Sequence, residues 1–132
     1  PDPARLRITP DVPAFATLDQ ALEATKADAV LLATPPDGHL AQCRACFAAG
    51  LPVLAEKPLS LDPAEANEIV RLAALHRAKL SVGLNFRYLA VTQAKRRLIA
   101  EGAFGAPGFA QMTYQRNRDG RAPRLNKYPL TM

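Results

Sequence analysis

Three short apolar runs recur along the chain, separated by longer stretches in which apolar residues return at helical spacing. The runs cover residues 28–33, 53–55 and 80–84. At 28–33 the apolar residues follow one another instead of alternating with polar ones, which is typical of strands in a parallel sheet that is covered on both faces. We therefore predict three buried strands.

Four helices are predicted around these strands, over residues 18–25, 39–49, 63–77 and 89–100. Thr17 and Gln20 form a capping box before the first helix. Asp62 is placed to cap the third helix, with Pro63 at its first position, and Gly50 stands where a C-terminal cap belongs. The apolar positions of the third helix are expected to face the core: Ala66, Ile69, Val70 and Ala73.

Helices that alternate with buried strands predict an α/β fold, a parallel sheet with helices on both sides. The pattern changes after Gly108, because residues 109–115 alternate and place Ala110, Met112 and Tyr114 on one face. This alternation predicts an antiparallel strand with one solvated face. A second kind of sheet is therefore expected to begin there.

The composition is that of a soluble globular domain. The chain has 132 residues, of which 48% are hydrophobic and 22% charged. No apolar run reaches the roughly 18 residues that a membrane span needs, and no signal peptide is visible. We expect a cytoplasmic protein that does not bind membranes.

The net charge of +5 is unevenly spread. Residues 1–84 carry 8 Lys/Arg and 10 Asp/Glu, a balance of −2, whereas residues 85–132 carry 9 and 2, a balance of +7. The basic tail comprises Arg116, Arg118, Arg121, Arg124 and Lys127. Such clusters can bind nucleic acid, but no recognition motif accompanies this one. We predict no nucleic-acid partner and favour a solvated tail, or a surface that meets anionic groups or another domain.

Cys43 and Cys46 form a C-x-x-C pair, and His39 lies on the same face of the expected helix. A redox pair needs a helix N-terminus to lower a thiol pKa, whereas these cysteines fall in mid-helix. Structural zinc needs four ligands, and no second Cys/His cluster supplies the fourth. Buried, reduced thiols are the favoured interpretation, and no metal site is predicted.

Polar residues follow each expected strand: Thr34-Pro35, Glu56-Lys57-Pro58 and Asn85-Phe86-Arg87. The carboxyl ends of parallel strands meet along one edge of the sheet, where open α/β folds bind their ligands. The three clusters are therefore expected to converge. A surface Glu-Lys pair before a turn is the alternative explanation of Lys57, but it does not account for the other two strand ends.

Taken together, residues 14–116 resemble the middle of the Gfo/Idh/MocA family of NAD(P)-dependent oxidoreductases. The resemblance is carried by Asp28-Ala29-Val30, Ala33-Thr34-Pro35-Pro36, His39, Ala49-Gly50, Val53, Glu56-Lys57-Pro58-Leu59, Glu65-Ala66, Val82-Gly83, Asn85-x-Arg87-Tyr88 and Gly102-x-x-Gly105. It implies a Rossmann-type domain over residues 1–101 and the start of an α+β domain over 102–132. Family members transfer a hydride between NAD or NADP and a hydroxyl-bearing carbon, usually of a sugar, polyol or related small molecule.

The resemblance also assigns roles to the strand-end residues. Lys57 is the catalytic lysine, which hydrogen-bonds the reacting oxygen and assists proton transfer. Thr34 and Pro35 line the ribose-pyrophosphate crevice. Glu56 contacts the nicotinamide ribose region.

Three further positions carry over from the family. Asn85 lies on the nicotinamide side. His39 lies near the cofactor or acts as a structural cap, and both readings stay open. Arg87 faces the substrate or braces the strand end.

The sequence departs from the family at its flanks. The G-x-G-x-x-G loop of the first βαβ unit is missing, and the series Gly102-x-x-Gly105-x-x-Gly108 follows a helix, so it does not qualify. Ala90 stands where the family usually has proline. We therefore expect a fragment of a longer, homo-oligomeric enzyme, inactive by itself. A non-catalytic nucleotide- or sugar-sensing protein on the same scaffold is the alternative function, and a module acting through the basic tail is a third.

Overall fold

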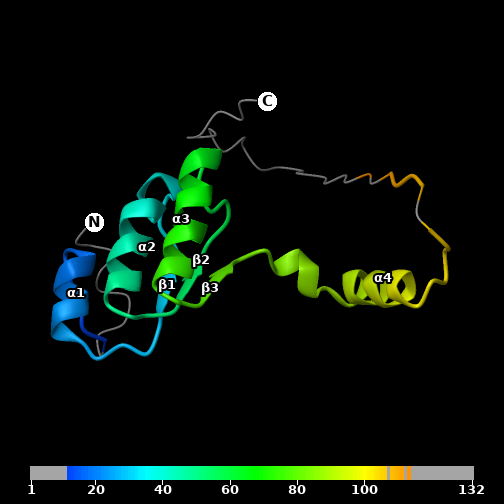
Figure 1. The fold of residues 1–132 in the computed structure, drawn as a ribbon. Coiled ribbons are helices and arrows are strands. Elements are labelled where there is room, and N and C mark those ends of the chain that lie inside the picture. The colour runs from blue at the N-terminus through cyan, green and yellow to red at the C-terminus, as the bar shows by residue number, and fades with distance from the viewer. Residues whose placement is uncertain (1–11, 107, 112, 114–132) are drawn as a thin grey trace, which may run out of the picture. The chain divides into compact units, whose positions relative to one another are not determined.

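The structure, a computed structural model, describes residues 12–106, 108–111 and 113 (Figure 1). The chain divides into two compact units, with the division between Thr92 and Gln93. The first contains all three strands, and most of the last helix belongs to the second. No helix in the described ranges is long and apolar enough to cross a membrane. The basic tail expected to be solvated lies outside these ranges.

A parallel sheet forms the centre of the first unit. Its strands β1 (Val30–Leu32), β2 (Val53–Ala55) and β3 (Leu80–Val82) pair in that order. Helix α2 (His39–Ala48) connects β1 to β2, and α3 (Pro63–Leu75) connects β2 to β3. The prediction of an α/β fold with a parallel sheet is confirmed.

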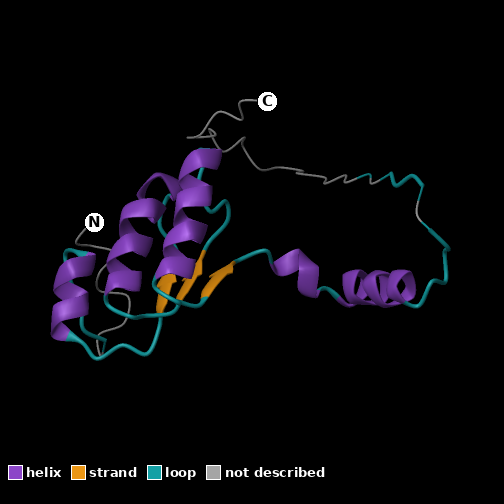
Figure 2. Cartoon of the chain, viewed as in Figure 1, coloured by secondary structure: helices purple, strands orange, loops and turns teal. Residues whose placement is uncertain are grey.

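Both connecting helices lie on the same face of the sheet, side by side (Figure 2). The prediction of helices on both faces is wrong for the described residues. Leu31 and Leu54 point to the opposite face and are 65% and 45% exposed. The strand order β1-β2-β3 adds each new strand at the same edge of the sheet. Because both crossovers are right-handed, their helices then lie on one face of the sheet. The continuous apolar runs therefore give one buried and one open face.

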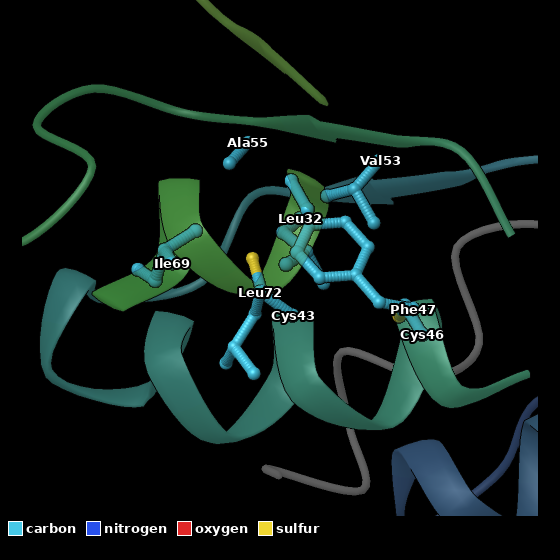
Figure 3. Close-up of a cluster of buried hydrophobic side chains, with 9 residues drawn as sticks. Leu32, Cys43, Cys46, Phe47, Val53, Ala55, Ile69 and Leu72 are labelled. Atoms are coloured by element: carbon cyan, nitrogen blue, oxygen red, sulfur yellow. The ribbon is translucent and has the colours of Figure 1, made fainter. Parts of the chain in front are cut away.

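The core lies between the sheet and the two connecting helices (Figure 3). Its buried members are Leu32, Cys43, Cys46, Phe47, Val53, Ala55, Ile69, Leu72 and Ala73. Figure 3 shows the Phe47 ring reaching from α2 toward Leu32 and Val53 of the sheet. Val70, expected in this core, is instead 55% exposed, and Leu72 is buried in its place. The buried face of the helix is therefore rotated relative to the expected apolar stripe, although Ile69 and Ala73 lie on both.

Helix ends follow the capping residues closely. Thr17 Oγ1 accepts a hydrogen bond of 3.2 Å from the Gln20 N–H at the start of α1 (Leu18–Ala24). The Gln20 side chain also reaches back, but its Oε1 accepts from the Ala16 N–H. Asp62 Oδ1 accepts from the Ala64 N–H at 2.8 Å before α3. These local interactions explain why the starts of both helices were predictable.

The second unit contains most of helix α4 (Ala90–Ala100), which ends before Gly102 with its φ of 73°. Residues 108–111 and 113 form no strand. The strand expected over 109–115 is therefore not formed at residues 109–111 and 113. Residues 112, 114 and 115 lie outside the described part. A strand exists only when paired, so the alternation alone could not establish one.

Arg77 gives a stability prediction. Its φ of 51° follows α3, in the left-handed region that favours glycine. We expect Arg77→Gly to raise the free energy of unfolding by about 0.5–1 kcal/mol, because the relief of left-handed strain exceeds the entropy cost of glycine. Gly50 ends α2 with a φ of 74° and open space around it, so Gly50→Ala should lower that energy by about 1 kcal/mol. Urea denaturation measures both. A loss of stability in Arg77→Gly would contradict the backbone argument.

Candidate active site

The three polar strand ends meet at one edge of the sheet. The register aligns Leu32, Ala55 and Val82, and the ladder continues one residue further. The Glu56 N–H donates to Leu32 O at 2.8 Å, and the Gly83 N–H donates to Ala55 O at 2.8 Å. Adjacent strands lie about 4.8 Å apart, so the loops that follow them are neighbours. The expected convergence is present in the backbone.

Glu56 folds back along this edge. Its Oε2 accepts a hydrogen bond of 3.0 Å from the Lys57 N–H. Its carboxylate also lies over Gly83, because a Cβ added at that glycine would be 3.4 Å from Glu56 Oε1. The carboxylate therefore occupies the end of β3, and the absence of a side chain at position 83 leaves room for it. The sequence pointed to Glu56 but not to this role of Gly83.

Lys57 is exposed at the tip of the loop that follows β2. The peptide between Lys57 and Pro58 is cis. The adjacent carboxylate of Glu56 accepts from the backbone of Lys57, and no carboxylate among the described residues forms an ion pair with the Lys57 amine. An amine that pairs with no carboxylate of the described residues is available to an oxygen atom of a ligand.

Thr34 and Pro35 follow β1 and precede the short 3-10 helix η2 (Pro36–Gly38). Thr34 Oγ1 donates to Gln42 Oε1 of α2 at 2.6 Å. A Cβ added at Gly38 would lie 3.3 Å from Gln42 Nε2, so the glutamine amide fits closely between the loop and the helix. Sequence reasoning missed Gln42, although its position three residues after His39 places both on one helix face.

His39 is buried, with 1% of its surface exposed. Its Nδ1 lies 3.0 Å from Leu59 O and its Nε2 lies 3.1 Å from Thr34 O. Both ring nitrogens thus face backbone carbonyls of two different loops. This arrangement is a tertiary contact, unlike a helix cap, which would bond the first turn of its own helix. Direct contact between His39 and a cofactor stays a prediction.

Asn85 and Arg87 lie in the 3-10 helix η3 (Asn85–Tyr88), directly after β3. The Arg87 N–H donates to Leu84 O at 3.1 Å, and both side chains are exposed. Asn85 also lines a hollow of about 740 Å³ over the open face of the sheet. That hollow is bordered mainly by apolar residues and does not include Thr34 or Lys57.

The two cysteines are free and fully buried in α2. Burial, and secondarily the neighbouring Cys46, raise the pKa of the Cys43 thiol to about 11. Burial also raises the pKa of the Cys46 thiol. The interpretation as buried thiols is confirmed, because such groups stay protonated and unreactive near neutral pH. Within the described ranges, no three His, Cys, Asp or Glu residues are grouped as metal ligands would be.

Comparison with known proteins agrees with this geometry. Residues 2–84 match the family model Gfo/Idh/MocA, described as an oxidoreductase family with an NAD-binding Rossmann fold. The chain belongs to this family. Gfo/Idh/MocA membership confirms the family resemblance and accounts for the parallel sheet with its connecting helices.

Individual Gfo/Idh/MocA relatives are similar over the same part. Inositol 2-dehydrogenase of Leifsonia xyli is 42% identical over 93 residues, which are 70% of this chain and 27% of the relative. The rhizopine catabolism protein MocA of Rhizobium meliloti is 31% identical over 91 residues, 69% of this chain and 29% of that protein.

A solved structure, the WlbA dehydrogenase from Bordetella pertussis in complex with NADH and UDP-GlcNAcA, aligns with a TM-score of 0.66 and 31% identity. The alignment covers 69% of this chain and 26% of that one. The chain thus spans between a quarter and a third of the length of these relatives.

Proposed function

We propose that the protein is an NAD- or NADP-dependent oxidoreductase that transfers a hydride between the nicotinamide and a hydroxyl-bearing small molecule, a polyol or sugar. The observation that carries this proposal is the alignment of three polar loops at the carboxyl edge of the sheet, with the Lys57 amine free of any ion pair in the described chain. The similarity to inositol 2-dehydrogenases supports a polyol substrate.

The residues present fit part of a nicotinamide site. Gly83 leaves the end of β3 without a side chain, and the Glu56 carboxylate beside it can accept hydrogen bonds from ribose hydroxyls. No glycine-rich phosphate loop follows a strand among the described residues. We therefore assign this chain to the nicotinamide and ribose half of the site.

Lys57 is the group we assign to the substrate oxygen. When bound beside Glu56, a nicotinamide would supply the acceptor for the hydride of the substrate carbon. As the carbonyl forms, the hydroxyl proton passes to the lone pair of the unprotonated Lys57 Nζ; in the reverse direction the resulting ammonium hydrogen-bonds the carbonyl oxygen and returns the proton. Lysine suits this role because its ammonium is a compact donor whose proton can be exchanged.

The other residues at the strand ends are assigned to the cofactor and the substrate around Lys57. Thr34 and Pro35 border the ribose-pyrophosphate crevice, with the Thr34 hydroxyl oriented by Gln42. Asn85 contacts the nicotinamide side, and Arg87 faces the substrate or braces the end of β3.

We further propose a domain assignment for the whole protein. Residues 1–101 belong to the Rossmann-type domain, and residues 102–132 begin an α+β domain. That second domain would support a homo-oligomer. A cytoplasmic location stays a prediction.

A turnover assay of the full-length protein tests this function. Purified protein is mixed with NAD⁺ or NADP⁺ and a panel of polyols and sugars that includes myo-inositol, and formation of reduced nicotinamide is followed by absorbance. We expect reduction with at least one member of the panel. Nucleotide binding without turnover on any member would contradict the proposal and favour a non-catalytic sensor.

A further inference from the structure

One buried imidazole joins the two loops that carry the proposed site. His39 is the first residue of α2, and its ring lies between Leu59 O at 3.0 Å and Thr34 O at 3.1 Å. Leu59 belongs to the loop between β2 and α3, and Thr34 to the loop after β1. We call this arrangement, His39 with its two carbonyl partners, the His39 bridge.

Leu59, one partner in the His39 bridge, follows Lys57 by two residues in the sequence. On the other side of Lys57, the Glu56 N–H is bonded to Leu32 O at 2.8 Å. The Leu59 side chain packs against the core. The exposed Lys57 therefore lies between two fixed points of the loop that follows β2. One is Glu56, which is bonded to β1, and the other is Leu59, which contacts His39.

Histidine suits this bridge for physical reasons. A neutral imidazole has one N–H, so it donates a hydrogen bond to one of the two carbonyls, and the tautomer decides which; its other nitrogen contacts the second carbonyl without a hydrogen bond. The ring is rigid, so the separation of the two loops is set by its own dimensions. A partly buried carbonyl that is left without a hydrogen-bond donor destabilises the arrangement that holds it. Removal of the ring therefore favours movement of the loop.

We propose that His39 is a positioning residue that fixes the Lys57 loop relative to the Thr34 loop. The expected effect of His39 on turnover rests on the proposed function, whereas its effect on the position of the Lys57 loop does not. A displaced catalytic group lowers turnover much more than it lowers nucleotide affinity, because the approach of the reacting atoms is sensitive to displacements of about 1 Å. His39 then acts through Lys57 without touching the substrate.

The kinetic test uses the full-length protein with His39→Gln and His39→Leu, and His76→Gln as the matched control. His76 is the exposed histidine that follows α3, away from the strand ends. We expect kcat to fall between about tenfold and a hundredfold in the His39 variants, with the Kd for reduced nucleotide little changed. An unchanged kcat in both variants would overturn the proposal.

A double-mutant cycle separates positioning from general weakening. If His39 acts through Lys57, then His39→Gln should cause no further loss of kcat in a Lys57→Ala background, because the group it positions is already gone. A loss of kcat in this background as large as that in the wild-type background would contradict the proposal.

Hydrogen exchange supplies a readout that does not depend on turnover. Without nucleotide, the hydrogen-bonded amides of Glu56, Lys57 and Asp62 should exchange about tenfold faster in His39→Gln than in wild type or His76→Gln, because the loop opens more often. Unchanged exchange at these amides would refute the proposal even in an active enzyme. An inactive wild-type protein would instead refute the proposed function, and exchange would still decide this inference.

Discussion

Lys57→Ala is expected to lower the kcat of the full-length protein by a factor of about 10²–10⁴, the range that general acid–base groups contribute. The Lys57 amine is exposed at the carboxyl edge of the sheet, and no carboxylate of the described chain pairs with it. Its removal should leave the surrounding packing intact. The Kd for nicotinamide nucleotide should therefore change little, so that the defect appears in kcat.

Lys79→Ala is the matched control for this experiment. Lys79 is also exposed, but it precedes β3 at the opposite end of the sheet, where its carbonyl accepts from the Val53 N–H at 2.9 Å. We expect its kcat to match the wild type. Steady-state kinetics with titration of nucleotide fluorescence measure both quantities. A Lys57→Ala protein with wild-type kcat would remove Lys57 from the catalytic role.

Ile69→Ala should destabilise the fold by about 2–5 kcal/mol, the range observed for buried Ile or Leu truncations. Ile69 is fully buried on α3 and belongs to the cluster between the helices and the sheet. The truncation removes buried methyl groups and leaves a cavity that close packing fills only in part. The free energy of unfolding from urea denaturation is the measurement.

The neighbouring residue supplies the control. Val70 is 55% exposed, so Val70→Ala should change the free energy of unfolding by no more than about 0.5 kcal/mol. Similar losses in the two variants would show that α3 faces the sheet with a different side from the one described. The pair therefore tests the rotation of the helix that the sequence pattern placed wrongly.

Local chemistry explains which parts of the fold were predictable. Thr17 and Asp62 cap their helices with hydrogen bonds to residues within three positions, and Gly50 adopts the positive φ that only glycine accepts easily. The convergence of the strand ends followed from parallel topology, which alternating helices and strands imply. These features depend on short sequence separations or on general topology.

The remaining features depend on contacts between distant segments. The exposure of Leu31 and Leu54 follows from the direction in which strands are added, which an apolar run does not encode. The His39 bridge joins residues twenty positions apart in the chain. Gln42 meets Thr34 only once α2 has packed against the loop after β1. Tertiary geometry, which spacing does not reveal, decides each of these.

The site residues show the same division. The residue types at the strand ends, together with the family pattern, pointed to Lys57 and Glu56. The space over Gly83 that admits the Glu56 carboxylate became visible only with the backbone in place. Side-chain direction at a strand end depends on its neighbours, so sequence alone identifies the residue and not its contacts.

The location of the nicotinamide tests the central claim most directly. A crystal structure of the full-length protein with NADH bound would show the ring relative to the carboxyl ends of β1, β2 and β3. We predict that the nicotinamide lies at this edge beside Glu56 and Asn85, with Lys57 Nζ within about 3 Å of the position of a reacting oxygen. A nicotinamide bound away from these strand ends, or a Lys57 amine turned from it, would contradict the account.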